Sequence, residues 1–580
     1  MTFSSGPPND PRKFSSGGTF RIPARAAPAS TPPAPAPPAR DAAADGRTLQ
    51  AILQATQDDI PRAIVMAEAA LADGFEHAVL LNLVALRLEN EGRLPEALMR
   101  LHRARELAPR DVGTLNALGL CLHRLERSHE AIEVFDALLE VNPNLPFAQA
   151  NRAAALQATG RLDRAEEGYR RALALAPGHP VALTGLASIA SRKGAHAEAE
   201  ALAVQVLKIE PNVPDASMSL ARAEAATGRG EAAAARMRGL LADPRMSPLD
   251  TADAWNLLGD ILDARGATAE AFDAYEACNR GLQKLYAERF AIGDSALDFA
   301  RGMTGYFQRA RPQDWARRPA VPANPYAPRA HVFLIGFPRS GTTLLETALA
   351  GSPDVVTLEE QEALADGVRR YLRDPRDLNA LAQASEAELG EFRAAYWRRV
   401  REAGCEVAGK VFVDRYPLNT LKLPLIARLF PDARILFALR DPRDVVWSCY
   451  RRRFRMSSPM YQFLTLPGAA AFYDATLALK TRMDAVVALD QRTVRHEDLL
   501  ADFEGEMKSI CSYIGLEWRE TMRDVAARTA DRTIATPSTA QIARGLNTEG
   551  VGQWRRYADR MGPALNILRP WVERFGYPAD

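Results

Sequence analysis

The sequence predicts a multidomain fold in which an all-α solenoid of helical repeats precedes an α/β domain with a parallel sheet. The chain has 580 residues, which is too many for one hydrophobic core. Small residues and prolines recur every 33 or 34 positions through the first half. After residue 329, short apolar runs alternate with helical patterns, and the first run ends in a glycine-rich loop.

Composition narrows the classes of function. Lys and Arg total 73 and Asp and Glu total 72, so the net charge of +1 argues against a general binder of nucleic acid or membrane surfaces. The five cysteines are widely spaced and form no C-x-x-C pair, which favours a reducing compartment and no structural zinc. No apolar run is long enough to span a membrane or to serve as a signal core. We expect a soluble, cytoplasmic protein, and the abundance of Ala and Arg suggests a bacterial one.

The first segment, residues 1–46, is rich in Pro, Ala, Ser and Gly. Such a composition buries too little apolar surface to offset the entropy of ordering, so we predict a disordered tail. A tail without a role and a tail that binds a partner both remain open.

The second segment, residues 47–300, carries the repeat. Glycines recur in the same register as the other repeated residues, and Glu126 takes one of the glycine positions. A small residue lets two helices approach closely, a glycine ends the first helix, and a proline stops the second. The recurring residues are Pro109, Pro143, Pro177, Pro211 and Pro244, and Ala97, Ala131, Ala165, Ala199 and Ala233.

This pattern resembles the tetratricopeptide repeat (TPR), most clearly in "VGTLNALGLCLHRLERSHEAIEVFDALLEVNPNL". A further unit, "AWNLLGDILDARGATAEAFDAYEAC", arrives four residues late. The resemblance implies stacked hairpins with a concave groove that suits a protein or peptide partner. A rigid spacer or an oligomerisation surface, including that of a homodimer, is the alternative.

The remaining segments are a proline-rich linker, residues 301–328, and an α/β domain, residues 329–580. The expected strands are 331–335, 407–413, 434–439 and 492–496, and the expected helices are 341–350, 418–430, 442–454 and 498–514. Strands that alternate with helices indicate a parallel sheet covered on both faces.

The loop after the first strand of this domain has the spacing of a phosphate-binding loop. In "HVFLIGFPRSGTT" the glycines are Gly336 and Gly341, but Thr342 stands where an ATP-binding loop has lysine. Consecutive backbone N–H groups and the helix start predict an anion site, in which Arg339 supplies the positive charge. The missing lysine and the absence of a magnesium-binding aspartate disfavour a kinase.

The segment "FPRSGTTLLETALAGSPDVVTLEEQ" resembles the 5′-phosphosulfate loop of sulfotransferases, closest to the tyrosylprotein sulfotransferase branch. The segment "FPDARILFALRDPRDVVWSCYRRRF" resembles the 3′-phosphate motif of that family, and "TPSTAQIARGLNTEGVGQWRRY" resembles its closing segment. The resemblance implies that 3′-phosphoadenosine 5′-phosphosulfate (PAPS) is the co-substrate and that no metal is needed. It assigns donor binding to Pro338, Arg339, Ser340, Gly341, Thr342, Thr343, Arg440, Ser448, Arg452, His496, Gln541 and Trp554.

The same resemblance implies the catalytic residues. Glu360 would deprotonate the acceptor hydroxyl, Arg339 would hold the phosphosulfate, and Ser538 would steady the leaving oxygen. Arg415 replaces the lysine expected at that oxygen, and Lys410 is a weaker substitute. His496 takes the place of a tyrosine, and its ring would contact the adenosine phosphate end or simply close a strand.

The implied reaction transfers a sulfuryl group to a hydroxyl, with a protein or peptide tyrosine brought by the TPR groove as the leading acceptor. A glycan, lipid or small metabolite is an alternative acceptor. A TPR scaffold with a degenerate nucleotide-sensing domain is the alternative that is not an enzyme. The basic run "RRRFR", residues 451–455, suggests an acidic acceptor or a solvated helix end.

Overall fold

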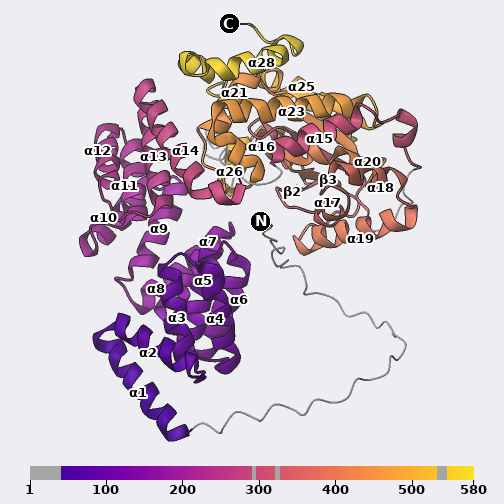
Figure 1. Ribbon diagram of the computed structural model, residues 1–580. Helices are drawn as coiled ribbons and strands as arrows, with labels where there is room; N and C mark the ends of the chain where they lie inside the picture. Colours follow the sequence, from indigo (N-terminus) through magenta and orange to yellow (C-terminus); the bar gives the residue numbers. More distant parts are fainter. Residues whose placement is uncertain (1–40, 291–294, 320–326, 532–544, 580) are drawn as a thin grey trace, which may run out of the picture.

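The computed structural model describes residues 41–290, 295–319, 327–531 and 545–579, and it confirms the predicted fold class. An all-helical region is followed by a domain with a five-stranded parallel sheet (Figure 1). The helices of the first region are α1 (Ala42–Asp58), α2 (Ile60–Ala72), α3 (Ala78–Asn90), α4 (Leu94–Leu107), α5 (Val112–Arg124), α6 (Ser128–Val141), α7 (Pro146–Ala158), α8 (Leu162–Leu175), α9 (Pro180–Arg192), α10 (His196–Ile209), α11 (Pro214–Ala226), α12 (Gly230–Leu241), α13 (Pro248–Ala264) and α14 (Thr268–Phe290).

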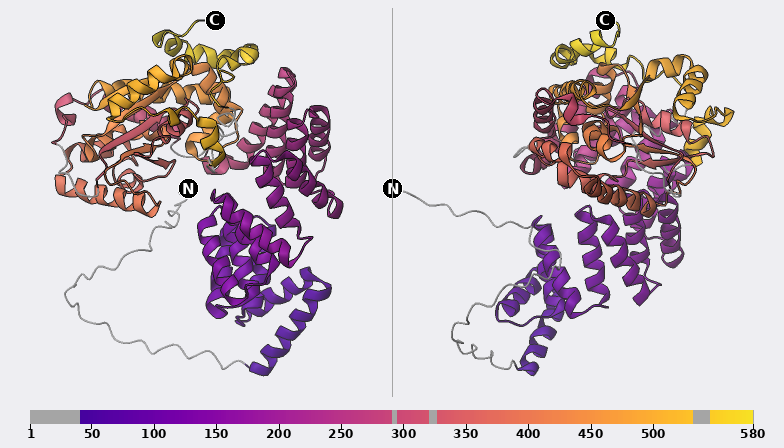
Figure 2. Two further views of the ribbon diagram at one scale, coloured as in Figure 1. Left: turned by 180° about the vertical axis from the view of Figure 1, so that it is seen from behind. Right: turned by 90° about the vertical axis from the view of Figure 1, so that its right-hand side faces the viewer.

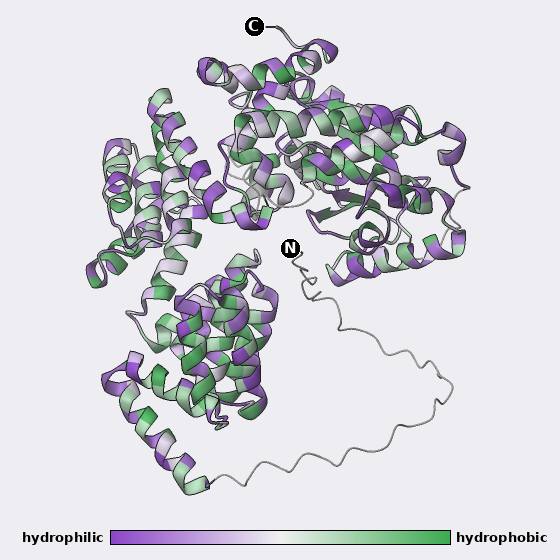
Figure 3. Ribbon diagram, in the orientation of Figure 1, coloured by the Kyte–Doolittle hydropathy of each residue, from purple (hydrophilic) through white to green (hydrophobic). Residues whose placement is uncertain are grey.

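The repeat register is visible in the helix starts. Helices α5, α7, α9, α11 and α13 begin 34 residues apart, and four of them begin with a proline, whose fixed φ suits the first helical position. The last repeat unit, which is offset by four residues in the sequence, begins with α13. This helix has 17 residues, whereas α11 has 13. Apolar and polar residues alternate around these helices, as expected of hairpins that stack (Figure 3).

The glycines between paired helices adopt the left-handed conformation, for example Gly92 with φ of 75° and Gly160 with φ of 80°. Glu126 occupies the same position with φ of 60°, which is unfavourable for a residue with a Cβ. The turn geometry is therefore kept where the sequence departs from the repeat.

Helices and ordered turns also occur across the expected linker. Helix α15 (Ala296–Phe307) spans the boundary expected at residue 300, and it packs on α23 (Leu466–Asp484) of the α/β domain. A 3₁₀ turn, η1 (Pro312–Trp315), follows and buries Trp315 beneath the guanidinium of Arg428. The chain between the two regions is thus partly folded against the α/β domain.

The sheet has the strand order β2-β3-β1-β4-β5, with every pairing parallel. The strands are β1 (Ala330–Gly336), β2 (Val355–Glu359), β3 (Val411–Arg415), β4 (Arg434–Leu439) and β5 (Asp490–Arg495). Strand β2 was not among the expected strands. It is an edge strand whose first three residues are only half-buried, so it lacks the continuous apolar run of the central strands.

Side chains of β1 alternate between two cores. Val332 and Leu334 face one core with α16 (Thr342–Leu349) and α25 (Phe503–Ile514), whereas Phe333 and Ile335 face the other. The second core also holds α19 (Glu386–Glu402), α20 (Leu423–Leu429), α21 (Pro442–Tyr450), α23 and α28 (Gly562–Arg574). The remaining elements are α17 (Ala365–Tyr371), η2 (Pro375–Asp377), α18 (Leu378–Gln383), η3 (Pro417–Lys422), α22 (Ser458–Tyr461), η4 (Gln462–Leu464), α24 (His496–Ala501), η5 (Glu520–Met522), α26 (Val525–Asp531) and η6 (Gln553–Arg560).

The end of the solenoid lies beside the α/β domain in each view (Figures 1 and 2). One continuous apolar core joins α11–α14 to α21, η6 and α28. No helix in the described part of the chain combines the length and apolar character that a bilayer span needs.

Candidate functional site

The loop between β1 and α16 has the backbone of an anion site. Arg339 and Gly341 adopt positive φ values of 72° and 96°, so the chain turns sharply before α16 begins at Thr342. Ser340, Thr342 and Thr343 are buried. Successive amides near a helix start suit an anionic ligand.

Three arginines from separate elements gather at this loop. Arg339 Nε donates to Ser448 Oγ at 2.9 Å, and Arg440 Nη1 donates to the carbonyl oxygen of Arg339 at 3.1 Å. Burial, together with the nearby charges of Arg452 and Arg440, lowers the pKa of Arg339 to about 9. Like charges held together in this way favour an anion between them.

His496 closes the loop from the end of β5. A Cβ added to Gly341 would lie 2.6 Å from His496 Nδ1, so only glycine fits there. Burial, with the charges of Arg440 and Arg339, lowers the pKa of His496 to about 3, which keeps the ring neutral. Its Nδ1 is buried and has no hydrogen-bond partner among the described residues.

The loop separates two pockets that share Arg339, Gly341 and Thr343. The first pocket adds Arg440 and His496 together with Leu344, Leu500 and residues 545–547. The second adds Glu360 and a largely apolar wall made of Tyr416, Pro417, Leu418, Phe454 and Met460. One anion site therefore faces a polar pocket on one side and a carboxylate in an aromatic pocket on the other.

Arg415 holds this carboxylate in place. Its Nη1 lies 2.6 Å from Glu360 Oε1 and its Nη2 lies 2.7 Å from Glu359 Oε1. A third carboxylate, Glu346 on α16, is 3.6 Å from Arg415 Nε, and both of these side chains are fully buried. Glu360 itself has φ of 45°, and its N–H donates to the carbonyl oxygen of Arg415.

Lys410 lies at the opposite end of β3 from Arg415. Its Nζ donates to the carbonyl oxygen of Pro353 at 3.0 Å. It is therefore not placed to substitute for Arg415.

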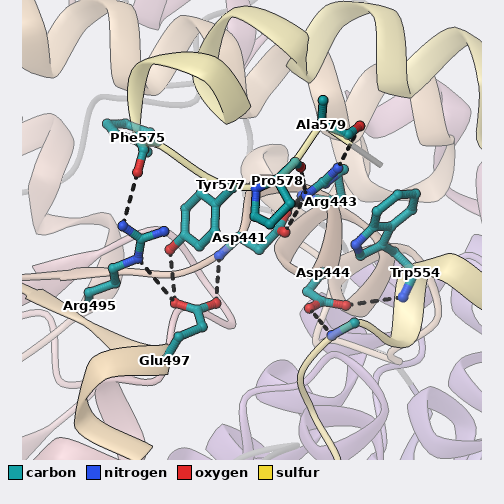
Figure 4. A network of polar contacts seen from close by, with 11 residues as sticks. Asp441, Arg443, Asp444, Arg495, Glu497, Trp554, Phe575, Tyr577, Pro578 and Ala579 are labelled. Carbon is teal, nitrogen blue, oxygen red and sulfur yellow. Dashed lines mark hydrogen bonds and ion pairs between the residues drawn. The ribbon is translucent and has the colours of Figure 1, made fainter. Parts of the chain in front are cut away.

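A network behind the loop fixes the strand end that carries Arg440 (Figure 4). The N–H of Asp441 donates to Glu497 at 3.0 Å, and Tyr577 Oη donates to the other oxygen of Glu497 at 2.9 Å. Arg495 lies over the Tyr577 ring at 3.8 Å. The C-terminal residues thus brace the polypeptide next to the anion site.

Trp554 belongs to the adjacent part of the network (Figure 4). Asp444 accepts hydrogen bonds from the N–H groups of Gly552 at 2.6 Å and Trp554 at 3.1 Å. The Arg443 guanidinium lies 4.2 Å from the centre of the indole ring. Trp554 is buried and lines neither pocket, and its donor-binding role stays a prediction.

Two predicted site residues, Ser538 and Gln541, lie outside the described residues. Of the other predicted residues, eleven lie in the loop or next to it, whereas Trp554 and Arg415 line neither pocket. The eleven are Pro338, Arg339, Ser340, Gly341, Thr342, Thr343, Glu360, Arg440, Ser448, Arg452 and His496.

Sequence reasoning missed Glu346 and Asp444. Both are acidic residues on helices that follow a strand, and burial alone distinguishes them from solvated charges.

The basic run 451–455 has partners within the chain, instead of a free surface for an acidic acceptor. Arg451 pairs with Asp263, Arg453 with Asp253, and Arg455 with Glu126. All three partners belong to the solenoid, so the run joins the two regions.

Comparison with known proteins gives the class of each region. Residues 331–520 match the sulfotransferase family, and residues 85–147, 151–216 and 218–280 match the tetratricopeptide repeat. The chain therefore carries TPR repeats followed by a domain of the sulfotransferase family.

Individual relatives are distant. An uncharacterised protein of Aquifex aeolicus is 23% identical over 256 residues, which cover 43% of this chain and 33% of that protein. Protein-tyrosine sulfotransferase A of Caenorhabditis elegans is 23% identical over 284 residues, covering 42% of this chain and 67% of the relative. A solved tetratricopeptide repeat protein from Parabacteroides merdae has a TM-score of 0.34 and 17% identity, covering 41% of this chain and 93% of that one. The match thus spans about a third of the Aquifex relative.

Proposed function

We propose that this protein transfers the sulfuryl group of PAPS to an acceptor hydroxyl, and that the acceptor is a tyrosine of a protein or peptide recruited by the TPR region. The observation that carries the proposal is the loop that stands between two pockets. Its arginine cluster suits a phosphosulfate, and Glu360 lies on the other side.

The residues present fit the donor. Arg440, Ser448 and Arg452 would hold the 3′-phosphate, and the loop amides with Arg339 would hold the 5′-phosphosulfate. Leu500 and Leu546 offer an apolar wall for the adenine. Among the described residues, no group of His, Cys, Asp and Glu is arranged to bind a metal ion.

The chemistry follows from these positions. Glu360 accepts the proton of the acceptor hydroxyl while the hydroxyl oxygen forms a bond to the sulfur of PAPS. The bond between sulfur and the bridging oxygen breaks, and the leaving phosphate keeps the electron pair. Arg339 and the loop amides stabilise the charge that develops on that phosphate, and Arg415 orients the carboxylate of Glu360.

The acceptor pocket supports a phenol. Tyr416, Phe454 and Met460 line the space beside Glu360, and aromatic rings pack well against such a wall. A cleft of about 1040 Å³ also opens from Glu360 toward the solenoid, where Thr159, Gly160 and Arg161 form its far side. An extended polypeptide lying in this cleft would contact the repeats and present a side chain to the pocket.

The test uses PAPS carrying labelled sulfate and a library of short peptides, in which each tyrosine peptide has a phenylalanine twin. Label on tyrosine peptides alone supports the proposal. Transfer of label to a glycan, lipid or phenolic metabolite, with no label on peptides, would mean that the acceptor belongs to that class instead. Failure to bind the donor would favour a TPR scaffold instead of an enzyme.

A further inference from the structure

The last hairpin of the solenoid, α13 and α14, is packed against α21, the helix that carries Ser448 and connects Arg440 to Arg452. Phe272 stacks on Trp447 with ring centroids 6.1 Å apart, and Tyr275 meets the same indole edge-on at 6.0 Å. Tyr557 also stacks on this indole, with ring centroids 3.9 Å apart. This buried aromatic contact is of the kind found inside a domain, so the hairpin and α21 form one packed unit.

Two amides of the hairpin complete the end of α21. Asn279 Nδ2 donates to the carbonyl oxygen of Tyr450 at 2.9 Å, and Asn256 Nδ2 donates to that of Arg451 at 2.9 Å. The last carbonyls of a helix have no partner within the helix, so these bonds supply one. The hairpin therefore fixes the backbone next to Arg452.

One face of α13 carries three carboxylates. Asp253, Asp260 and Asp263 are separated by seven and three residues, a spacing that places them on the same side of a helix. Each pairs with a different arginine of the run after α21. The pairs are Asp253 with Arg453, Asp260 with Arg452, and Asp263 with Arg451.

The middle pair differs from the others because Arg452 also reaches toward the anion site. Arg452 Nη1 donates to Asp260 Oδ2 at 3.2 Å, and Tyr275 Oη donates to the other oxygen of Asp260 at 2.9 Å. Arg452 Nε is buried and has no partner among the described residues. The charge of Arg452 also acts on the Arg339 guanidinium and lowers its pKa, so Arg452 lies close to the loop.

We infer that Asp260 is a positioning residue of the donor site, in which it holds Arg452 ready for the 3′-phosphate. This inference rests on the proposed function. The solenoid then does more than bind the acceptor protein, because its final hairpin contributes to the site that selects the nucleotide. The physical reason is preorganisation: a long side chain fixed at one nitrogen loses less entropy when a phosphate binds its other nitrogens.

The test compares two nucleotides by calorimetric titration of the full chain. 3′-Phosphoadenosine 5′-phosphate (PAP) carries the 3′-phosphate, and adenosine 5′-monophosphate lacks it. In Asp260→Asn, the oxygen that accepts from Tyr275 remains and only the acceptor for Arg452 changes. We expect PAP affinity to fall roughly fivefold, the size of one lost orienting hydrogen bond, with affinity for the monophosphate unchanged.

Asp253→Asn is the matched control. It removes a carboxylate from the same face of α13 and breaks the pair with Arg453, which is not one of the predicted donor-binding residues. A role confined to docking the two regions would give the same result in both variants. We expect the ratio of the two affinities to change in Asp260→Asn alone.

A third variant separates a direct effect from one through Arg452. In an Arg452→Ala background, Asp260→Asn should cause no further loss of PAP affinity. An unchanged or increased preference for PAP in Asp260→Asn overturns the inference while leaving the proposed function intact. A wild-type protein that binds PAP no better than the monophosphate overturns both.

Discussion

Glu360 and Arg415 face each other across the end of the sheet, with 2.6 Å between the carboxylate oxygen and the guanidinium nitrogen. The arginine side chain is fully buried, whereas 46% of the glutamate side chain is exposed. A guanidinium can bind Glu359 and Glu360 through separate nitrogens, which a lysine ammonium does less well. The departure from the lysine of the family pattern therefore creates a fixed support for the proposed base.

Replacement of this base should stop the reaction without loss of the donor. In Glu360→Gln, the amide keeps the shape of the side chain but accepts no proton, so we expect kcat to fall by roughly a thousandfold. Affinity for PAP, measured by calorimetry, should remain within about twofold because Glu360 lies on the acceptor side of the loop. Turnover near the wild-type level would remove Glu360 from the mechanism.

The close approach of Gly341 to His496 gives a second prediction. A Cβ in Gly341→Ala would lie 2.6 Å from His496 Nδ1, on a backbone with φ of 96°. Such strain costs about 1–3 kcal/mol, so we expect PAP affinity to fall by about tenfold or more. The double variant with His496→Ala relieves the clash but keeps the strained φ, and it should recover part of the loss. No loss in the single variant would mean that the loop adapts.

Glu126 offers a test of the repeat geometry. Its left-handed backbone should cost about 1 kcal/mol, which exceeds the value of its exposed pair with Arg455. Glu126→Gly should therefore raise the melting temperature of the solenoid. Gly92→Ala is the reverse control, because its φ is 75° and no atom lies within 4 Å of the added Cβ. A lower melting temperature in Glu126→Gly would contradict this account.

Asp414, beside Arg415, predicts a dependence of stability on pH. Burial raises the pKa of Asp414 to about 7, although a hydrogen bond from Tyr396 Oη at 2.7 Å acts in the opposite direction. The folded state thus binds this proton more tightly than the unfolded state does. Its contribution to stability is complete below the unfolded pKa of about 4 and is lost as the pH rises through about 7.

The variant Asp414→Asn removes that proton and keeps an acceptor for Tyr396. Between pH 5 and pH 8, its urea midpoint should fall less than that of the wild type. His331, whose pKa burial lowers to about 3, is present in both proteins and cancels in the difference. Equal pH profiles would show that Asp414 is ionised throughout.

Much of the fold could be predicted from local patterns. The 34-residue period located the hairpins, and the loop between Gly336 and Gly341 located the first strand and its helix. Strand β2 was not predicted, because an edge strand with half-exposed residues has no clear apolar pattern. The packed residues around Trp315 lie in a proline-rich segment, where composition gives no sign of tertiary contacts.

The sequence predicts site residues that lie together in one short segment. It does not predict contacts between segments that are far apart in the chain. The loop residues and Arg440 follow from short motifs, whereas the pairing of Arg452 with Asp260 joins residues 192 positions apart. The run 451–455 looked like a free basic surface because a sequence does not show which carboxylates face it. Tertiary pairing of charges is the information that the sequence alone lacks.

The proposed function requires that the loop between β1 and α16 holds an adenosine phosphosulfate. The direct test is calorimetric titration of the purified protein with PAP and, separately, with Mg-ATP, in the wild type and in Arg440→Ala. We expect tight binding of PAP without metal, weakened about tenfold or more by the substitution, and weak binding of Mg-ATP. Binding of Mg-ATP alone, or of neither nucleotide, would contradict it.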